Sequence, residues 1–90
     1  MNTTIENKKQ QFSTSSFYPA AFLLSKGFRL LTINRDNPNR CSFVFEDGPE
    51  REGLLHNFSF APDNDPAVLV DARRMVTAIK LLKENLYRDR

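Results

Sequence analysis

The chain has 90 residues, of which 40% are hydrophobic and 27% are charged, and a formal net charge of +2. This length provides for one domain and excludes two, and because a chain of this size hides only roughly 60–65% of its unfolded surface, self-association would add useful burial. One cysteine excludes an intrachain disulfide, and one cysteine with one histidine cannot supply the four ligands of a structural zinc site.

The chain opens on a polar segment, residues 1–11, that has no hydrophobic periodicity. We predict that it is a flexible N-terminal tail and that residues 12–90 form a single α+β domain. The segment lacks the apolar stretch of a secretory signal. No apolar run approaches the ~20 residues that a membrane span requires. We therefore expect a cytoplasmic protein without a membrane partner.

A first helix is predicted from about Ser16 to Lys26. Thr14 and Ser15 are candidate N-caps, because their hydroxyls can accept hydrogen bonds from first-turn amides. Gly27 suits the left-handed backbone that often follows a helix. The apolar residues recur at i, i+3, i+4 and i+7, which places them on one face that we expect to be deeply packed. They are Phe17, Ala20, Ala21 and Leu24.

A β-hairpin is predicted next, with strands at residues 28–35 and 40–46 that are rich in β-branched and aromatic side chains. The four residues between the strands, 36–39, are typical of a turn. A loop of that length fixes the register and hence the two faces of the hairpin. The predicted pairs are Leu30–Phe45 and Thr32–Phe43 on the core face, and Leu31–Val44 and Ile33–Ser42 on the other. Two strands alone make a poor sheet, so a third strand or helix packing is required.

A shorter helix is predicted at residues 48–57, with Asp47 as its cap and Leu54, Leu55 and Phe58 on its apolar face. Residues 60–66 are predicted to form a loop. The segment 67–70 is expected to be extended and is the candidate third strand.

The last helix is predicted from about Asp71 to Tyr87, with Asp71 as a candidate N-cap. Its apolar residues are spaced by three and four, which predicts one core-facing stripe. The stripe contains Ala72, Met75, Ile79, Leu82 and Leu86, with Val76 beside it. The predicted fold is therefore α+β, in the order α-β-β-α-(β)-α. It is a small antiparallel sheet of two to three strands, with one face covered by the first and last helices and the second helix at an edge.

Residues with catalytic or metal-binding chemistry have simpler structural interpretations. An acidic cluster, Glu46, Asp47, Glu50 and Glu52, could hold Mg²⁺ or Ca²⁺, but helix capping and strand pairing account for these carboxylates. No nucleophile signature lies near His56, and Cys41 is interpreted as a small hydrophobic residue of a strand. No glycine-rich phosphate loop is present. We expect no catalytic residue, metal, cofactor or small-molecule substrate, and therefore no enzyme.

Charge is distributed unevenly along the chain. Residues 1–45 and 66–90 are net basic, whereas residues 46–65 hold six acidic residues and one arginine. Such a layout fits self-pairing as well as an anionic partner. The basic residues of the hairpin and the last helix are either a solvated surface or contacts to an anion or a nucleic acid. These candidates are Arg29, Arg35, Arg40, Arg73, Arg74 and Lys80.

Several stretches of this sequence are similar to a family of short bacterial and phage proteins. They are Thr14-Ser15-Ser16, Ala20-Ala21-Phe22-Leu23-Leu24, Lys26-Gly27-Phe28, Cys41-Ser42-Phe43-Val44-Phe45-Glu46-Asp47, Val70-Asp71-Ala72 and Leu82-Lys83-Glu84-Asn85-Leu86-Tyr87. The family is catalogued as domain of unknown function 5659, and the likeness covers about residues 12–87. The resemblance implies a fold and a bacterial or mobile-element origin, and no activity or ligand.

Two function classes follow from the sequence. The first is a non-enzymatic protein-interaction module that self-associates as a homo-oligomer, because the hairpin has two partly apolar faces and the charged segments are opposed. The alternative is a nucleic-acid-binding accessory protein that works through the six basic residues named above.

Overall fold

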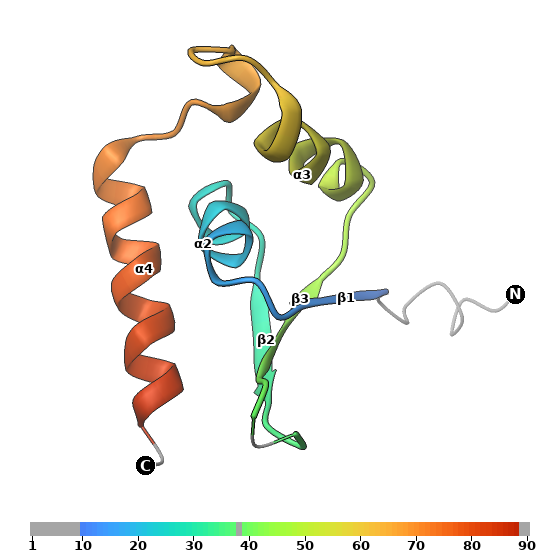
Figure 1. Ribbon diagram of the computed structural model, residues 1–90, viewed down its shortest axis with the longest axis vertical. Coiled ribbons are helices and arrows are strands. Elements are labelled where there is room, and N and C mark those ends of the chain that lie inside the picture. The colour runs from blue at the N-terminus through green and yellow to red at the C-terminus, as the bar shows by residue number, and fades with distance from the viewer. Residues whose placement is uncertain (1–9, 38, 89–90) are drawn as a thin grey trace, which may run out of the picture.

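The computed structural model of the chain describes residues 10–37 and 39–88 (Figure 1). The predicted α+β class is confirmed. The elements are β1 (Gln11–Thr14), α2 (Phe17–Ser25), β2 (Leu30–Asn34), β3 (Ser42–Glu46), α3 (Arg51–Phe60), a 3₁₀ turn η1 (Pro66–Val68) and α4 (Ala72–Tyr87). None of the helices in this part of the chain is both long enough and apolar enough to cross a membrane.

The three strands form one antiparallel sheet in the order β1-β3-β2, with β3 at its centre. The prediction of a third strand at residues 67–70 is wrong, since the first half of that segment lies in η1 and none of it belongs to the sheet. The physical reason is local. The Asp65 carboxylate accepts a hydrogen bond from the Ala67 amide at 2.8 Å, and Pro66 begins the turn with its φ already fixed.

The third strand comes instead from the N-terminal end, which moves the predicted boundary of the domain. Gln11 pairs with Glu46, and the Asp47 amide donates to the carbonyl of Gln10 at 2.9 Å. Gln11 is therefore part of the sheet, and Gln10 is hydrogen-bonded beside it, so neither belongs to a tail. The rest of the predicted tail, residues 1–9, lies outside the described residues.

A β-bulge changes the predicted register of the hairpin. Leu30 pairs with Phe45 as predicted, but Ile33 pairs with Phe43 in place of Ser42, because the register shifts between Leu30 and Thr32. One extra residue in β2 moves every later side chain to the other face. Ile33 therefore packs against the core, and Leu31 is left 37% exposed.

Helix α2 is at the centre of the core and lies between the strands and α4 (Figure 1). Its apolar stripe is confirmed. The fully packed cluster joins three elements and consists of Ala20, Ala21 and Leu23 of α2, Phe43 and Phe45 of β3, and Ala78 and Leu82 of α4. The prediction that the last helix also covers the sheet is wrong, because α4 packs mainly on α2, which lies between α4 and the strands (Figure 1). The α4 stripe is confirmed at Met75, Ile79, Leu82 and Leu86, whereas Ala72 and Val76 are exposed.

Two of the predicted helix caps are wrong. Residue Ser16 occupies the N-cap of α2 without a side-chain bond, and the Thr14 hydroxyl accepts from the Ser16 amide at 3.1 Å. Helix α3 begins three residues later than predicted, with Glu50 at its N-cap and again without a side-chain bond. Asp47 lies three residues before this N-cap, and its carboxylate accepts from the Gly48 amide and the Arg51 side chain. No residue of α3 is fully buried.

Asp71 is the N-cap of α4 as predicted, and its carboxylate accepts from the amides of Arg73 and Arg74 at 2.8 and 3.2 Å. We expect Asp71→Ala to lower the free energy of unfolding by about 1 kcal/mol, the usual cost of losing such a cap. Urea denaturation followed by circular dichroism measures this loss. Asp63→Ala, at an exposed loop position, is the control and should change stability by less than about 0.5 kcal/mol. Equal losses in both variants would contradict the capping role.

Candidate functional site

One side of α4 faces two adjoining hollows, which together we call the α4 groove. The first, of about 450 Å³, lies between α2 and the N-terminal half of α4. The second, of about 540 Å³, lies between β2 and the C-terminal half of α4. Leu24 and Leu81 line both hollows and therefore join them into one surface.

The groove combines aliphatic side chains with arginines. Leu24, Leu30, Ile33 and Leu81 line it, and Leu81 is 40% exposed. Among the described residues that line the two hollows, the charged side chains are five arginines and one aspartate. They are Arg29, Arg35, Arg73, Arg74 and Arg88, with Asp71. An exposed aliphatic surface bordered by charges of one sign is typical of a protein or anion contact.

The structure brings four of the six predicted basic residues together in the groove, namely Arg29, Arg35, Arg73 and Arg74. Arg40 lies in the connection between β2 and β3, where its amide donates to the carbonyl of Asn37 at 3.0 Å. Lys80 is exposed on α4 and lines neither hollow. It precedes Leu81 by one residue, which turns it about 100° away around the helix.

Arg88 is a groove residue that the sequence prediction missed. A signal for it exists, since Arg74, Leu81 and Arg88 are spaced by seven residues and therefore lie along one face of α4. An arginine thus stands at each end of this face, and an exposed leucine stands between them. The pattern favours a partner with apolar groups between anionic groups.

Arg35 closes the groove at the C-terminal end of α4. Its guanidinium donates to the carbonyl of Asn85 and, at 3.3 Å, to the carbonyl of Leu86. The last carbonyls of a helix have no partner within the helix and carry partial negative charge, so a cation stabilises them. Arg35 therefore ties the end of β2 to the end of α4, and we assign it a structural role in addition to its charge.

The acidic residue and the buried hydroxyl of the groove are both engaged within the chain. The Asp71 carboxylate accepts two amide hydrogen bonds at the N-terminus of α4, as described above. The Ser25 side chain is buried, and its hydroxyl donates to the carbonyl of Phe22 at 2.7 Å. The same carboxylate lies 4.0 Å from Nε of Arg73, so Asp71 offsets part of the charge of that arginine, and Ser25 has its donor already committed.

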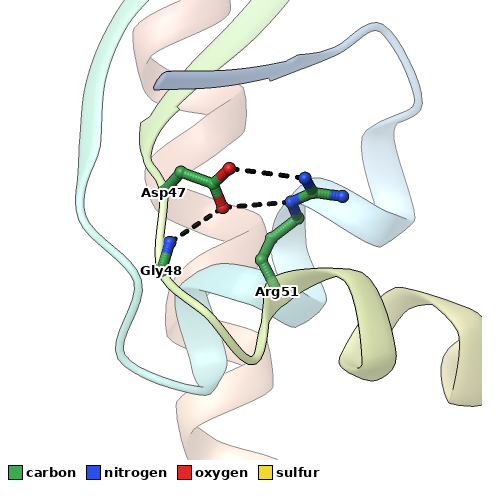
Figure 2. A network of polar contacts seen from close by, with 3 residues as sticks. All are labelled: Asp47, Gly48 and Arg51. Carbon is green, nitrogen blue, oxygen red and sulfur yellow. Dashed lines mark hydrogen bonds and ion pairs between the residues drawn. The ribbon is translucent and has the colours of Figure 1, made fainter. Parts of the chain in front are cut away.

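Within the predicted acidic cluster, Glu46, Asp47 and Glu50 line one shallow hollow together with Lys26 and Arg29, and Asp47 has a structural role. Asp47 forms an ion pair with Arg51, with its Oδ1 3.1 Å from Nε, and the same oxygen accepts from the Gly48 amide (Figure 2). The Arg51 guanidinium also lies 3.9 Å from the centre of the Phe12 ring, a cation–π contact. Through these contacts Arg51 fastens β1 to the start of α3. The hydrogen bond from Arg51 holds the pKa of Asp47 below its ordinary value of 3.8.

A lowered pKa links this ion pair to the pH dependence of stability. Because the folded pKa of Asp47 lies below the unfolded one, the pair stabilises the fold above pH 3.8, and this contribution is lost as the pH falls through the folded pKa. The pair is partly exposed, so we expect a contribution of at most about 1 kcal/mol. Arg51→Met should remove this part of the acid dependence in urea titrations between pH 5 and pH 2, whereas Glu52→Gln should not. An unchanged pH profile for Arg51→Met would contradict a contribution of the Asp47–Arg51 pair to the acid dependence of stability.

The remaining candidates for chemistry stand apart from one another. Within residues 10–37 and 39–88, no group of three or more histidine, cysteine, aspartate and glutamate side chains is arranged to hold a metal ion. His56 is exposed on α3, with its ring 5.0 Å from that of Phe60. Cys41 is half-buried and is not disulfide-bonded.

Comparison with known proteins identifies a family and no function. A family model described as "Domain of unknown function (DUF5659)" matches residues 9–88. No curated protein and no solved structure matches the chain.

Proposed function

The chain belongs to the DUF5659 family, and because that description names no activity, we propose from the geometry of the α4 groove that it is a non-enzymatic protein-interaction module. The observation that carries the proposal is the continuous groove in which Leu24 and Leu81 join two arginine-bearing hollows. Aliphatic groups at the centre of a contact supply burial, and charges at its rim select the partner. The partner that fits is an acidic segment of a protein.

The non-enzymatic part of the proposal rests on the chemistry of the lining. Arginine and leucine side chains bind and orient, but they neither attack a substrate nor shuttle protons at neutral pH. Ser25 lines the first hollow and carries a hydroxyl that could act as a nucleophile, but this hydroxyl donates to a backbone carbonyl. An assay of the purified chain against generic ester, phosphoester and peptide substrates tests this part, and turnover lost on Ser25→Ala would contradict it.

Affinity capture from native cells tests the lead proposal. We expect an acidic protein to be retained by the wild-type chain after nuclease treatment, and by a control carrying Arg40→Glu and Lys80→Glu outside the groove. It should be lost from a variant carrying Arg29→Glu and Arg74→Glu. Equal retention by both variants would contradict the groove as the binding surface. The proposal includes the cytoplasmic location that the sequence predicts, and fractionation of the same cells tests it.

Self-association, the form of interaction that the sequence favours, is kept as a separate arm of the proposal. It would require an acidic surface of one copy to enter the groove of another. Exposed Glu52 and Asp63 are available, together with Phe60, which is 75% exposed. Asp47 and Asp65, by contrast, are held by intramolecular bonds. Light scattering at tens of micromolar protein in low and high salt tests this arm, and a monomer under both conditions would contradict it.

A nucleic-acid partner is the second candidate function, and the convergence of four predicted arginines on one groove is the observation that favours it. Single-strand sites usually add exposed aromatic rings for stacking. The aromatic residue that lines the groove, Phe28, is half-buried. This candidate predicts micromolar binding to labelled DNA that weakens steeply with salt. The absence of any change in fluorescence anisotropy at 50 mM salt would remove it.

A further inference from the structure

The second hollow of the groove runs along the edge of a strand. Successive residues of a strand alternate between its two faces, so a hollow on one face is lined by every second residue. Here residues 28–33 all line the hollow without a gap, which places it beside the backbone of β2. In the described part of the chain, β2 is hydrogen-bonded to β3 on one side and to no strand on the other. In Figure 1, β2 stands between α4 and the other two strands.

A free strand edge carries unpaired amide and carbonyl groups that can accept another strand. The opposite wall of the hollow is α4, with Leu81, Asn85 and Arg88, so a segment that lies along β2 would also contact this helix. Alternate side chains of such a segment would meet Leu24 and Leu81, and the others would face solvent. Main-chain hydrogen bonds would provide affinity, and the apolar contacts would provide specificity.

Charge decides which segment fits this edge. Among the described residues that line this hollow, three are arginines and none is acidic, and the arginines are Arg29, Arg35 and Arg88. A second copy would bring the same arginines to the edge, and like charges brought together disfavour a strand pair. The same arginines attract an acidic strand.

We propose that the β2 edge of the α4 groove binds an acidic, extended segment of a partner protein as a fourth strand of the sheet. This inference rests on the proposed function and specifies how the partner binds. A five-residue strand spans about 17 Å, so β2 can pair with about five residues of the segment. The segment alternates apolar and acidic residues, with its apolar side chains on Leu24 and Leu81 and its carboxylates on the other face, near the exposed side chain of Arg29.

Nuclear magnetic resonance of the full ¹⁵N-labelled chain tests the proposal with a defined probe, an end-blocked octapeptide that alternates valine and glutamate. We expect saturable shifts in the amides of residues 28–33 and of Leu81 and Asn85. Raising the salt from 50 to 500 mM should weaken binding, because the arginines are exposed to solvent. A peptide with lysine in place of glutamate should not bind.

A second probe separates strand addition from side-chain docking. N-methylation of the valines removes the backbone donors on one edge of the peptide, and N-methylation of the glutamates removes those on the other edge. We expect one of the two modifications to weaken binding by about tenfold, because at least two hydrogen bonds to β2 are lost, and the other to change affinity much less. Arg29→Glu should abolish binding, whereas Arg40→Glu, on the same hairpin, should not.

Three results would overturn the proposal. In the first, the β2 amides do not respond to millimolar peptide. In the second, both N-methylated peptides bind as well as the parent peptide. In the third, the same amides shift when the protein alone is concentrated, which would identify a second copy as the occupant. None of these would remove an acidic partner captured through the groove arginines, so failure of the strand mode is distinguishable from failure of the proposed function.

Discussion

Phe45→Ala is expected to lower the free energy of unfolding by about 3–5 kcal/mol, the usual cost of emptying a buried phenylalanine site. Phe45 is fully buried on β3, the central strand, and it belongs to the cluster that joins α2, β3 and α4. Whole domains are stable by only about 5–15 kcal/mol, so this loss is a large share of the total. The midpoint of thermal unfolding should fall by more than about 12 °C.

Circular dichroism during urea and thermal denaturation measures this effect. Leu69→Ala is the matched control, because Leu69 is 55% exposed and its truncation leaves no cavity. It should change stability by less than about 1 kcal/mol. A loss below about 1 kcal/mol for Phe45→Ala would show that β3 is not the centre of the core.

Gly27→Ala is expected to destabilise the fold by about 1–2 kcal/mol, because a side chain is unfavourable at a positive φ. Gly27 follows α2 with φ at +100°, and its amide donates to the carbonyl of Leu24 at 3.0 Å. A Cβ atom at Gly27 would meet nothing within 4 Å. The expected loss therefore comes from the backbone conformation and not from a clash.

Gly53→Ala is the matched comparison, and we expect it to change stability in the opposite direction. Gly53 lies inside α3 without a positive φ, and a Cβ atom there would also meet open space. Alanine in a helix interior is favoured over glycine by up to about 1 kcal/mol. Urea denaturation of the two variants should give shifts of opposite sign. Stabilisation by both substitutions would contradict the conformation assigned to Gly27.

The helices were predictable because their signals are local. The spacing of Met75, Ile79, Leu82 and Leu86 and the carboxylate of Asp71 define α4 without reference to the rest of the chain. The same holds for the apolar stripe of α2. Side-chain caps were less predictable, because a cap depends on the residue at which the helix begins, and α3 begins three residues later than its sequence pattern predicts.

The sheet was less predictable because its partners are distant in sequence. Strand β1 is only four residues long, and it exists because Phe12 and Thr14 pair with Phe45 and Phe43 more than 25 residues away. The β2 bulge likewise depends on the core, since it lets Ile33 pack inward. Nothing in the hairpin sequence alone distinguishes that register from the regular one.

Only part of the groove could be predicted. The composition identified Arg29, Arg35, Arg73 and Arg74 as candidates, but it also selected Arg40 and Lys80, which line neither hollow. The set of arginines that line the groove depends on the placement of α4 relative to β2. That placement is a tertiary arrangement, which the local sequence does not specify. The i, i+7, i+14 spacing of Arg74, Leu81 and Arg88 was the sequence signal for the remaining member.

A charge-swap titration tests most directly whether the groove selects an acidic segment. The wild-type chain should bind the valine–glutamate octapeptide and reject the valine–lysine one. A variant carrying Arg29→Glu and Arg74→Glu should reverse this preference, while a variant carrying Arg40→Glu and Lys80→Glu should keep it. If the groove variant still prefers the acidic peptide, or the control variant loses that preference, the arginines of the α4 groove do not select the partner.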